Sequence, residues 1–212
     1  MCYNIFSYLI KYLQIPVIFF LSYNAYISAQ KMSMGFCPPV EPMPYFNMDL
    51  YMGTWYQHAS IKSLIKALRN CVEYNYTADT HGGFHVESKY TTYRQTKPVV
   101  SFGYAKPEQY HGFPQKGAYK LTLFSEKANF TIDHLILNTD YDSFAVEYSC
   151  FEFLFFKRQN LHILVRDRLV NTTFVDSQLK ETLHSYKLDW LLRYFKPTRQ
   201  INCTNSFEKN SS

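Results

Sequence analysis

The stretch Tyr51–Gln57, with the sequence Tyr-Met-Gly-Thr-Trp-Tyr-Gln, follows a proline-rich segment and precedes a long series of apolar, alternating segments. Gly53 is one of seven glycines, and Trp55 is one of two tryptophans. A glycine permits a close turn that a side chain would block. A tryptophan directly after it can fill one end of a β-barrel with a large apolar ring. The stretch therefore predicts the start of a barrel, provided that the following segments supply its strands.

The composition favours a β-rich domain with a large core. The chain has 212 residues, of which 47% are hydrophobic and 18% aromatic, which fits one barrel or two small domains. Nineteen tyrosines and eighteen phenylalanines favour strands over helices. The formal net charge of +5 comes from scattered basic residues, and this pattern argues against nucleic-acid binding.

The N-terminal segment, residues 1–29, has the features of a secretory signal peptide. Lys11 supplies a positive charge, Ile15–Leu21 forms a short apolar core, and Ser28–Ala29 offers small residues for cleavage. Asn24 and the shortness of the apolar run argue against a membrane-spanning anchor. We therefore expect a secreted, extracellular protein with no stable membrane insertion, consisting of a barrel domain at 30–204 and a polar tail at 205–212.

The cysteines and sequons agree with secretion. Cys2 leaves with the signal peptide, and an even number remains, which predicts two disulfides with three possible pairings. The remaining cysteines are Cys37, Cys71, Cys150 and Cys203. The sequence has no Cys-x-x-Cys spacing and no pair of histidines near the cysteines, so we expect neither a metal nor a cofactor. The expected glycosylation sites are Asn75, Asn129 and Asn171.

Eight short segments alternate between apolar and polar residues, as half-buried strands do. They are the segment that begins at Trp55 and residues 71–77, 84–90, 99–105, 119–123, 130–137, 144–150 and 162–166. Turn residues separate them at His81–Gly83 and Thr139–Asp142. This even spacing predicts an all-β fold, an eight-stranded antiparallel up-and-down barrel.

One helix is expected after the strands. Apolar residues recur every three or four positions and would form one stripe that packs on the outside of the barrel. They are Val175, Leu179, Leu183, Tyr186 and Trp190. Thr173 together with Asp176 is expected to cap the start of this helix, and Pro197 prevents its continuation.

The alternation also predicts which side chains line the barrel and contact a ligand. The candidates are mostly aromatic and aliphatic: Tyr74, Tyr76, Phe84, Val86, Tyr90, Phe102, Tyr104, Tyr119, Leu121, Phe130, Ile132, His134, Phe144 and Tyr148. A register slip of one residue would invert any of these strands. His134 is the one candidate that titrates near neutral pH, and a structural role is favoured for it over metal ligation. Glu147 and Glu152 are interpreted as solvated, and no catalytic constellation is found, so we expect no enzymatic activity.

Three motifs in order resemble those of the lipocalin family. Gly53–Trp55 matches the opening motif, Asn138–Asp142 followed by Tyr148–Cys150 is similar to the second, and Ile163–Arg166 resembles the third. The resemblance extends from Cys37 to Cys203. Within the family the chain resembles apolipoprotein D and the arthropod bilin-binding and Lazarillo-type proteins. The motif residues carried over by this resemblance are structural: Gly53, Trp55, Thr139, Asp140, Tyr141 and Arg166.

The resemblance implies the disulfide pairs Cys37–Cys150 and Cys71–Cys203, and a guanidinium of Arg166 over the indole of Trp55. It also implies that the barrel cavity, not the motifs, holds the functional site. Two classes of function remain open. The first is a secreted carrier of a small hydrophobic ligand such as a lipid, sterol, retinoid, tetrapyrrole or carotenoid. The second is a secreted effector that binds proteins or scavenges small amines. The expected assembly is a monomer or a weak homo-oligomer.

Overall fold

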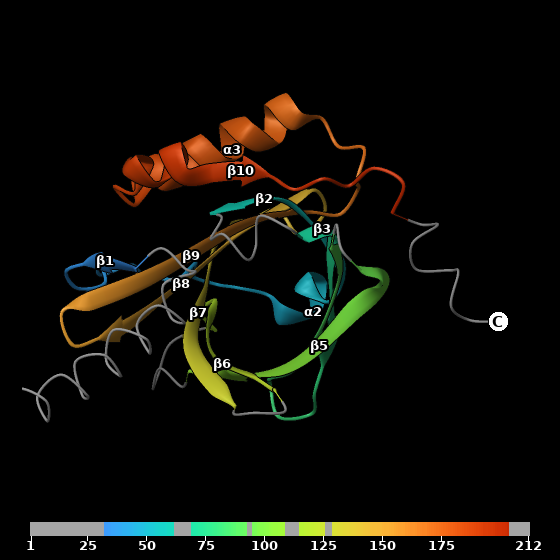
Figure 1. Cartoon of the computed structure of the whole chain (residues 1–212). Helices are drawn as coiled ribbons and strands as arrows, with labels where there is room; N and C mark the ends of the chain where they lie inside the picture. The colour runs from blue at the N-terminus through green and yellow to red at the C-terminus, as the bar shows by residue number, and fades with distance from the viewer. Residues whose placement is uncertain (1–31, 62–68, 93–94, 109–114, 126–128, 204–212) are drawn as a thin grey trace, which may run out of the picture.

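The computed structural model describes residues 32–61, 69–92, 95–108, 115–125 and 129–203, and its strands form one closed antiparallel barrel (Figure 1). The predicted signal peptide at 1–29 and the tail at 205–212 lie outside the described residues. The barrel strands are β2 (Gly53–Ile61), β3 (Arg69–Ala78), β4 (Phe84–Thr92), β5 (Gln95–Pro107), β6 (Ala118–Leu123), β7 (Phe130–Thr139), β8 (Phe144–Phe153) and β9 (Phe156–Val165). The predicted eight-stranded up-and-down barrel is thus confirmed.

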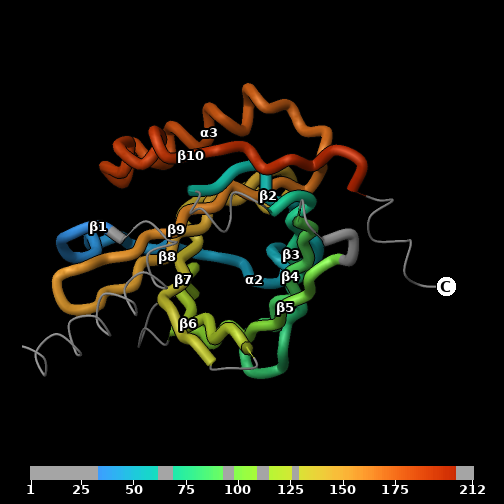
Figure 2. Tube along the Cα trace, viewed as in Figure 1, coloured from blue at the N-terminus to red at the C-terminus, as the bar shows by residue number. Residues whose placement is uncertain are grey.

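The barrel closes where β9 pairs with β2, from Tyr56 opposite Val165 to Ser60 opposite His162. Each other barrel strand pairs with its neighbour in sequence, so the tube in Figure 2 follows a simple ring. Two short strands that the sequence did not predict extend the sheet. They are β1 (Met32–Met34), which pairs with β9, and β10 (Phe195–Pro197), which pairs with β2.

The stretch around Trp55 closes one end of the barrel. The short helix α2 (Met48–Tyr51) precedes β2, and Asn47 caps it by accepting a hydrogen bond from the Leu50 amide at 3.3 Å. Trp55 is fully buried and donates its Nε1–H to the carbonyl oxygen of Tyr51 at 2.8 Å. The closed end is therefore a packed plug, because the helix and the first strand are fastened to each other.

Arg166, directly after β9, covers the outer side of this plug. Its guanidinium carbon lies 3.8 Å from the centroid of the Trp55 ring, which confirms the expected cation–π contact. The guanidinium also donates to four main-chain carbonyls at 3.0–3.2 Å, those of Leu50, Tyr51, Thr54 and Tyr141. Gly53 has a φ of +95°, and a Cβ there would lie 3.3 Å from this guanidinium. The positive φ therefore favours glycine, and a side chain at this position would also crowd the guanidinium.

The turn between β7 and β8 is built by its own side chains. The Asp140 carboxylate accepts hydrogen bonds from the amides of Asp142, Ser143 and Phe144 at 2.8–3.2 Å. The Thr139 hydroxyl donates to the Phe144 carbonyl at 2.7 Å, and the Tyr141 hydroxyl accepts from the Asn47 amide at 3.0 Å. These contacts give Thr139, Asp140 and Tyr141 the structural role that the resemblance implies.

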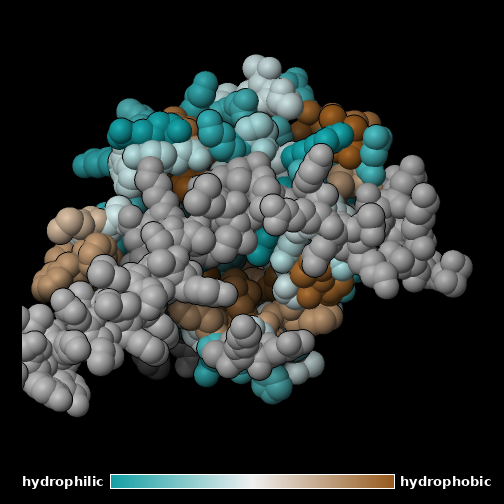
Figure 3. Space-filling model, viewed as in Figure 1, coloured by the Kyte–Doolittle hydropathy of each residue, from teal (hydrophilic) through white to brown (hydrophobic). Residues whose placement is uncertain are grey.

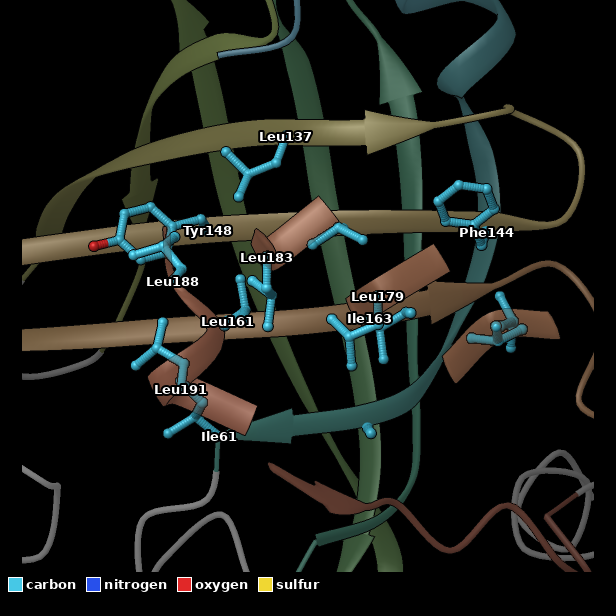
Figure 4. Packing of buried hydrophobic residues seen from close by; sticks show 14 residues of the cluster. Ile61, Leu137, Phe144, Tyr148, Leu161, Ile163, Leu179, Leu183, Leu188 and Leu191 are labelled. Carbon is cyan, nitrogen blue, oxygen red and sulfur yellow. The ribbon is translucent and has the colours of Figure 1, made fainter. Parts of the chain in front are cut away.

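The helix α3 (Thr172–Ser185) packs on the outer face of the barrel wall formed by β8, β9 and β2 (Figure 4). Val175, Leu179 and Leu183 face this wall, as the apolar stripe predicts. The predicted cap by Thr173 and Asp176 is wrong. Asn171 caps the helix instead, and its side-chain oxygen accepts from the amides of Thr173 and Phe174. Asn is as good an N-cap as Thr and stands two residues earlier in the chain.

The helix ends at Ser185, and the 3-10 helix η2 (Asp189–Tyr194) carries the chain to β10. Among the described residues, no helix combines the length and the apolar character needed to cross a membrane.

The two disulfides, Cys37–Cys150 and Cys71–Cys203, are those that the resemblance implies. Each joins a segment outside the barrel to a barrel strand. Cys37 precedes β2 and is linked to β8, and Cys203 follows β10 and is linked to β3. The two terminal arms are therefore held on the barrel by covalent bonds.

Candidate functional site

A cavity of about 310 Å³ lies inside the ring of strands and opens at the end opposite Trp55. In the space-filling view, hydrophobic residues line a hollow in the middle of the molecule (Figure 3). Residues of β3, β4, β5, β6, β7, β8 and β9 form its wall. A volume of this size is at the lower end of the range for small-molecule sites, about 300–1,000 Å³.

Many of the predicted residues line this cavity. They come from four strands whose alternation was read in the correct register: Tyr74, Tyr76, Val86, Tyr90, Leu121, Phe130, Ile132 and His134. Their position on the inner face follows directly from the pairing of β3 with β4 and of β6 with β7. Contact with a ligand stays a prediction for each of them.

Two further candidates point inward but lie below the cavity. Phe84 and Tyr119 are buried in the cluster that surrounds Trp55, with their ring centroids 4.7 Å apart in an edge-to-face contact. Burial raises the pKa of Tyr119 to about 12, so its hydroxyl stays protonated. These two rings form the floor on which the cavity rests.

The predicted register of β5 is wrong for Phe102 and Tyr104. Gly103 and Ala105 face inward, opposite Val86 and Phe84 of β4. Phe102 borders the cavity, but its side chain is 56% exposed on the outer face. The Tyr104 hydroxyl donates to the Asp79 carboxylate at 2.6 Å outside the barrel. The interior has room only for small residues here, because a Cβ on Gly103 would lie 3.1–3.3 Å from the side chains of Leu121 and Leu123.

The predicted register of β8 is also inverted. Phe144, Val146 and Tyr148 face outward and pack in the cluster beneath α3, where Figure 4 shows Tyr148 beside Leu183 and Leu188. Tyr148 belongs to this outer cluster and also borders the cavity. The apolar face of β8 packs against the helix, because burial of its aliphatic and aromatic side chains stabilises the contact between helix and sheet.

Because the register is inverted, Glu147 faces the interior. It is 3% exposed, which contradicts its interpretation as a solvated residue. Its Oε1 accepts hydrogen bonds from the hydroxyls of Tyr51 and Tyr76, both at 2.8 Å. Burial and the neighbouring carboxylate raise the pKa of both tyrosines, so both hydroxyls keep the protons that they donate.

Two histidines flank this carboxylate. His134 Nε2 lies 3.6 Å from Glu147 Oε1, and His162 Nδ1 lies 3.8 Å from Oε2. Burial alone would raise the pKa of Glu147, but the two imidazoles outweigh burial and hold that pKa well below its usual range. The Tyr74 ring stacks on His162 at 5.9 Å. A charged, hydrogen-bonded group therefore stands at the deep end of an otherwise aromatic cavity.

The described residues contain no group of three or more His, Cys, Asp or Glu side chains arranged to hold a metal ion.

Sequence reasoning missed several polar residues of the cavity: Arg69, Ser101, Glu147, Ser149, Arg158, Asn160 and His162. Those of β9 had a signal in the sequence. Leu161, Ile163 and Val165 form one apolar face, which packs beneath α3, so Arg158, Asn160 and His162 must face the other way. The alternation along β9 thus separates its polar residues from its apolar ones, and the packing of α3 shows which of the two faces is external.

The three predicted glycosylation sites Asn75, Asn129 and Asn171 are all exposed. Their positions are compatible with attached glycans, and glycosylation itself stays a prediction.

Comparison with known proteins finds relatives that cover most of the chain. Apolipoprotein D of Bos taurus is 28% identical over 178 residues, which span 84% of this chain and 89% of that protein. Apolipoprotein D of Macaca fascicularis is 29% identical over 177 residues, which span 82% and 87%. No model of a protein family matches the chain.

Two solved structures share the fold. Insecticyanin of the tobacco hornworm Manduca sexta has a TM-score of 0.71 at 15% identity, covering 84% of this chain and 94% of its own. H1 crustacyanin of the lobster Homarus americanus has a TM-score of 0.62 at 24% identity, covering 81% and 91%. None of the four proteins is named for an enzymatic activity.

Proposed function

Because the chain belongs to the lipocalin family, we propose that it is a secreted carrier, not an enzyme, that binds one small hydrophobic ligand in its barrel cavity. The observation that carries this proposal is a cavity of about 310 Å³ whose wall is mainly aromatic and aliphatic, above a floor sealed by Trp55 and Arg166. An eight-stranded barrel of this kind can hold one small ligand.

The shape of the wall supports a flat or extended apolar ligand. Tyr74, Tyr76 and Tyr90 present rings, and Leu121 and Ile132 present aliphatic surface. Such a surface suits a sterol, a retinoid, a carotenoid, a tetrapyrrole or a fatty acid, because the ligand would bury most of its apolar area. The two disulfides support secretion, since such bonds persist in oxidising compartments.

A small amine is the second candidate ligand, and Glu147 is the observation that favours it. A carboxylate that lines the cavity can pair with an ammonium group, and Oε2 of Glu147 accepts neither of the two tyrosine hydroxyls. An apolar ligand remains the preferred candidate, because the Glu147 carboxylate already has neighbours within the protein. They are Tyr51, Tyr76, His134 and His162.

The proposal is tested by native mass spectrometry and absorbance of the protein purified from its source. A released lipid or a visible absorbance band is the expected result, whereas a released amine would favour the second candidate. Ser88→Trp, which fills the cavity wall, is expected to abolish ligand binding. Lys89→Trp places the same ring on the outer face of the same strand and should leave binding intact. Equal ligand content in both variants would refute the cavity as the site.

A further inference from the structure

The polar residues of the cavity are concentrated on one side, where β8 and β9 lie next to each other. On β9, every second residue from 158 to 162 lines the cavity, and all of them are polar: Arg158, Asn160 and His162. On β8, Glu147 and Ser149 line the same space. The two strands pair so that Glu147 lies opposite His162 and Ser149 opposite Asn160. These five residues form a polar wall that extends from the deep end of the cavity toward its opening.

The other sides of the cavity are mainly apolar. The neighbouring strands β6 and β7 contribute four apolar residues: Leu121, Leu123, Phe130 and Ile132. Across the ring of strands from β8, β4 contributes Val86 and Tyr90. A ligand in this cavity therefore has one polar side and one apolar side to contact.

The polar side chains outside the polar wall are few among the described residues that line the cavity. Besides the tyrosine hydroxyls, they are Arg69, Ser88, Ser101 and His134. The two tyrosines of β3 use their hydroxyls within the protein, because Tyr76 donates to Glu147 at 2.8 Å and Tyr74 donates to Gln57 Oε1 at 3.2 Å. Their rings thus present apolar surface to the cavity.

The polar wall has hydrogen-bonding capacity to offer a ligand. The Asn160 amide carries two N–H donors and an acceptor oxygen, and its Nδ2 lies 3.4 Å from Ser149 Oγ, a long contact for a hydrogen bond. The Ser149 hydroxyl is itself a donor and an acceptor, and this residue is buried. Hydrocarbon packed against these groups would cost free energy, whereas ligand hydroxyls would bond to them.

The spacing of the polar wall distinguishes between ligands. The pair Glu147–His162 and the pair Ser149–Asn160 are two residues apart along their strands, which is about 7 Å. A ligand with one terminal polar group can reach only one of these pairs. A flexible chain without polar groups along its length would leave the second pair against methylene groups. A rigid ligand with several hydroxyls on one face can bond to both pairs at once.

We propose that the cavity selects a facially amphiphilic ligand, a rigid fused-ring molecule with several hydroxyls on one face and an apolar opposite face. The hydroxyls bond to the polar wall, and the apolar face packs against β4, β6 and β7. Ser149 and Asn160 determine this specificity, because they place polar groups halfway along the cavity. Steroid polyols have the required shape. The proposal rests on the carrier function and specifies its ligand class.

The test compares two uncharged epimers, methyl cholate and methyl ursocholate. All ring hydroxyls of methyl cholate lie on one face, whereas methyl ursocholate has one of them inverted to the other face. Equilibrium binding to the purified protein is expected to favour methyl cholate by roughly 10-fold, because the inverted hydroxyl loses its partner and meets an apolar wall. The epimers have the same formula, so a difference in affinity reports the placement of the hydroxyl.

Two variants of the polar wall test its role. Ser149→Ala and Asn160→Leu are each expected to remove most of the preference for methyl cholate. The control is Ser88→Ala, which deletes the same hydroxyl from β4 on the opposite side of the same cavity and should leave the preference unchanged. The ratio of the two affinities is measured on one protein sample, so partial misfolding of a variant would lower both affinities and leave their ratio intact.

Retinol, a flat ligand without a polar face, is measured in parallel to separate this proposal from the carrier function. If the protein binds retinol but does not prefer methyl cholate over its epimer, the facial selection is overturned and the carrier function stands. Binding of none of the three probes would count against the carrier function as well. An equal loss of the preference in Ser88→Ala and Ser149→Ala would show that the polar wall does not determine the specificity.

Discussion

At the scale of single residues, Arg166 joins three separate segments at the closed end. Its guanidinium stacks on Trp55 and donates to carbonyls of α2, of β2 and of the turn after β7. We predict that Arg166→Lys lowers the free energy of unfolding by about 2 kcal/mol or more, since an ammonium group cannot reproduce the planar set of donors. Urea denaturation measures this change.

The control for this prediction is Arg193→Lys, on an exposed residue of η2, which is expected to change stability by no more than about 0.5 kcal/mol. A similar small effect at Arg166 would mean that its contacts do not stabilise the barrel.

Glu147 is a second single residue with a measurable consequence, which is a dependence of stability on pH. Its folded pKa lies below its ordinary value, so the carboxylate stabilises the fold above about pH 4.3 and this contribution is lost as the pH falls through the folded pKa. We predict that Glu147→Gln flattens the acid-side decline of unfolding free energy, by up to about 1.4 kcal/mol per pH unit. Chemical denaturation from about pH 3 to 7 measures this slope.

Glu181→Gln, on the exposed face of α3, should leave the decline as steep as in the wild-type protein. Parallel stability curves for the wild-type protein and Glu147→Gln would contradict the assignment of a buried, ionised carboxylate.

At the scale of elements, packing against α3 determines which face of β8 and β9 points out of the barrel. Leu183 is fully buried between the helix and the sheet, whereas Leu169, just before the helix, is 91% exposed. We predict that Leu183→Ala costs about 2–5 kcal/mol, because it leaves a cavity between two packed layers. Leu169→Ala deletes the same side-chain atoms at an exposed position and should cost less than about 0.5 kcal/mol. Thermal unfolding measures the loss of stability in both variants. Equal losses in Leu183→Ala and Leu169→Ala would contradict the packing of α3 on the barrel.

At the scale of the whole molecule, two covalent links hold both terminal arms on the barrel. The residues that they join are 113 and 132 positions apart in the sequence. We predict that replacing either pair by serine lowers the unfolding free energy by about 2–5 kcal/mol, because each bond restricts a long segment of the unfolded chain. Denaturation of the two double variants measures this. A variant as stable as the wild-type protein would refute the role of that bond.

The sequence alone determined the architecture, because local patterns specify it. Alternation and turn residues placed eight strands in order, and the stripe through Val175, Leu179 and Leu183 placed the outer helix. The motif residues Gly53, Trp55 and Arg166 predicted how the barrel is closed, since their roles depend on contacts near the ends of two adjacent strands.

Only the tertiary structure decided which face of a strand points into the cavity. Alternation has a period of two and defines two faces, yet it does not say which face a helix will cover. On β8 the apolar face packs against α3. Phe144 and Tyr148 therefore face outward, contrary to the prediction, and Glu147 faces the cavity. On β5 the neighbouring leucines left space only for Gly103. The same long-range contacts place Glu147 of β8 and Arg158 of β9 on the faces that line the cavity.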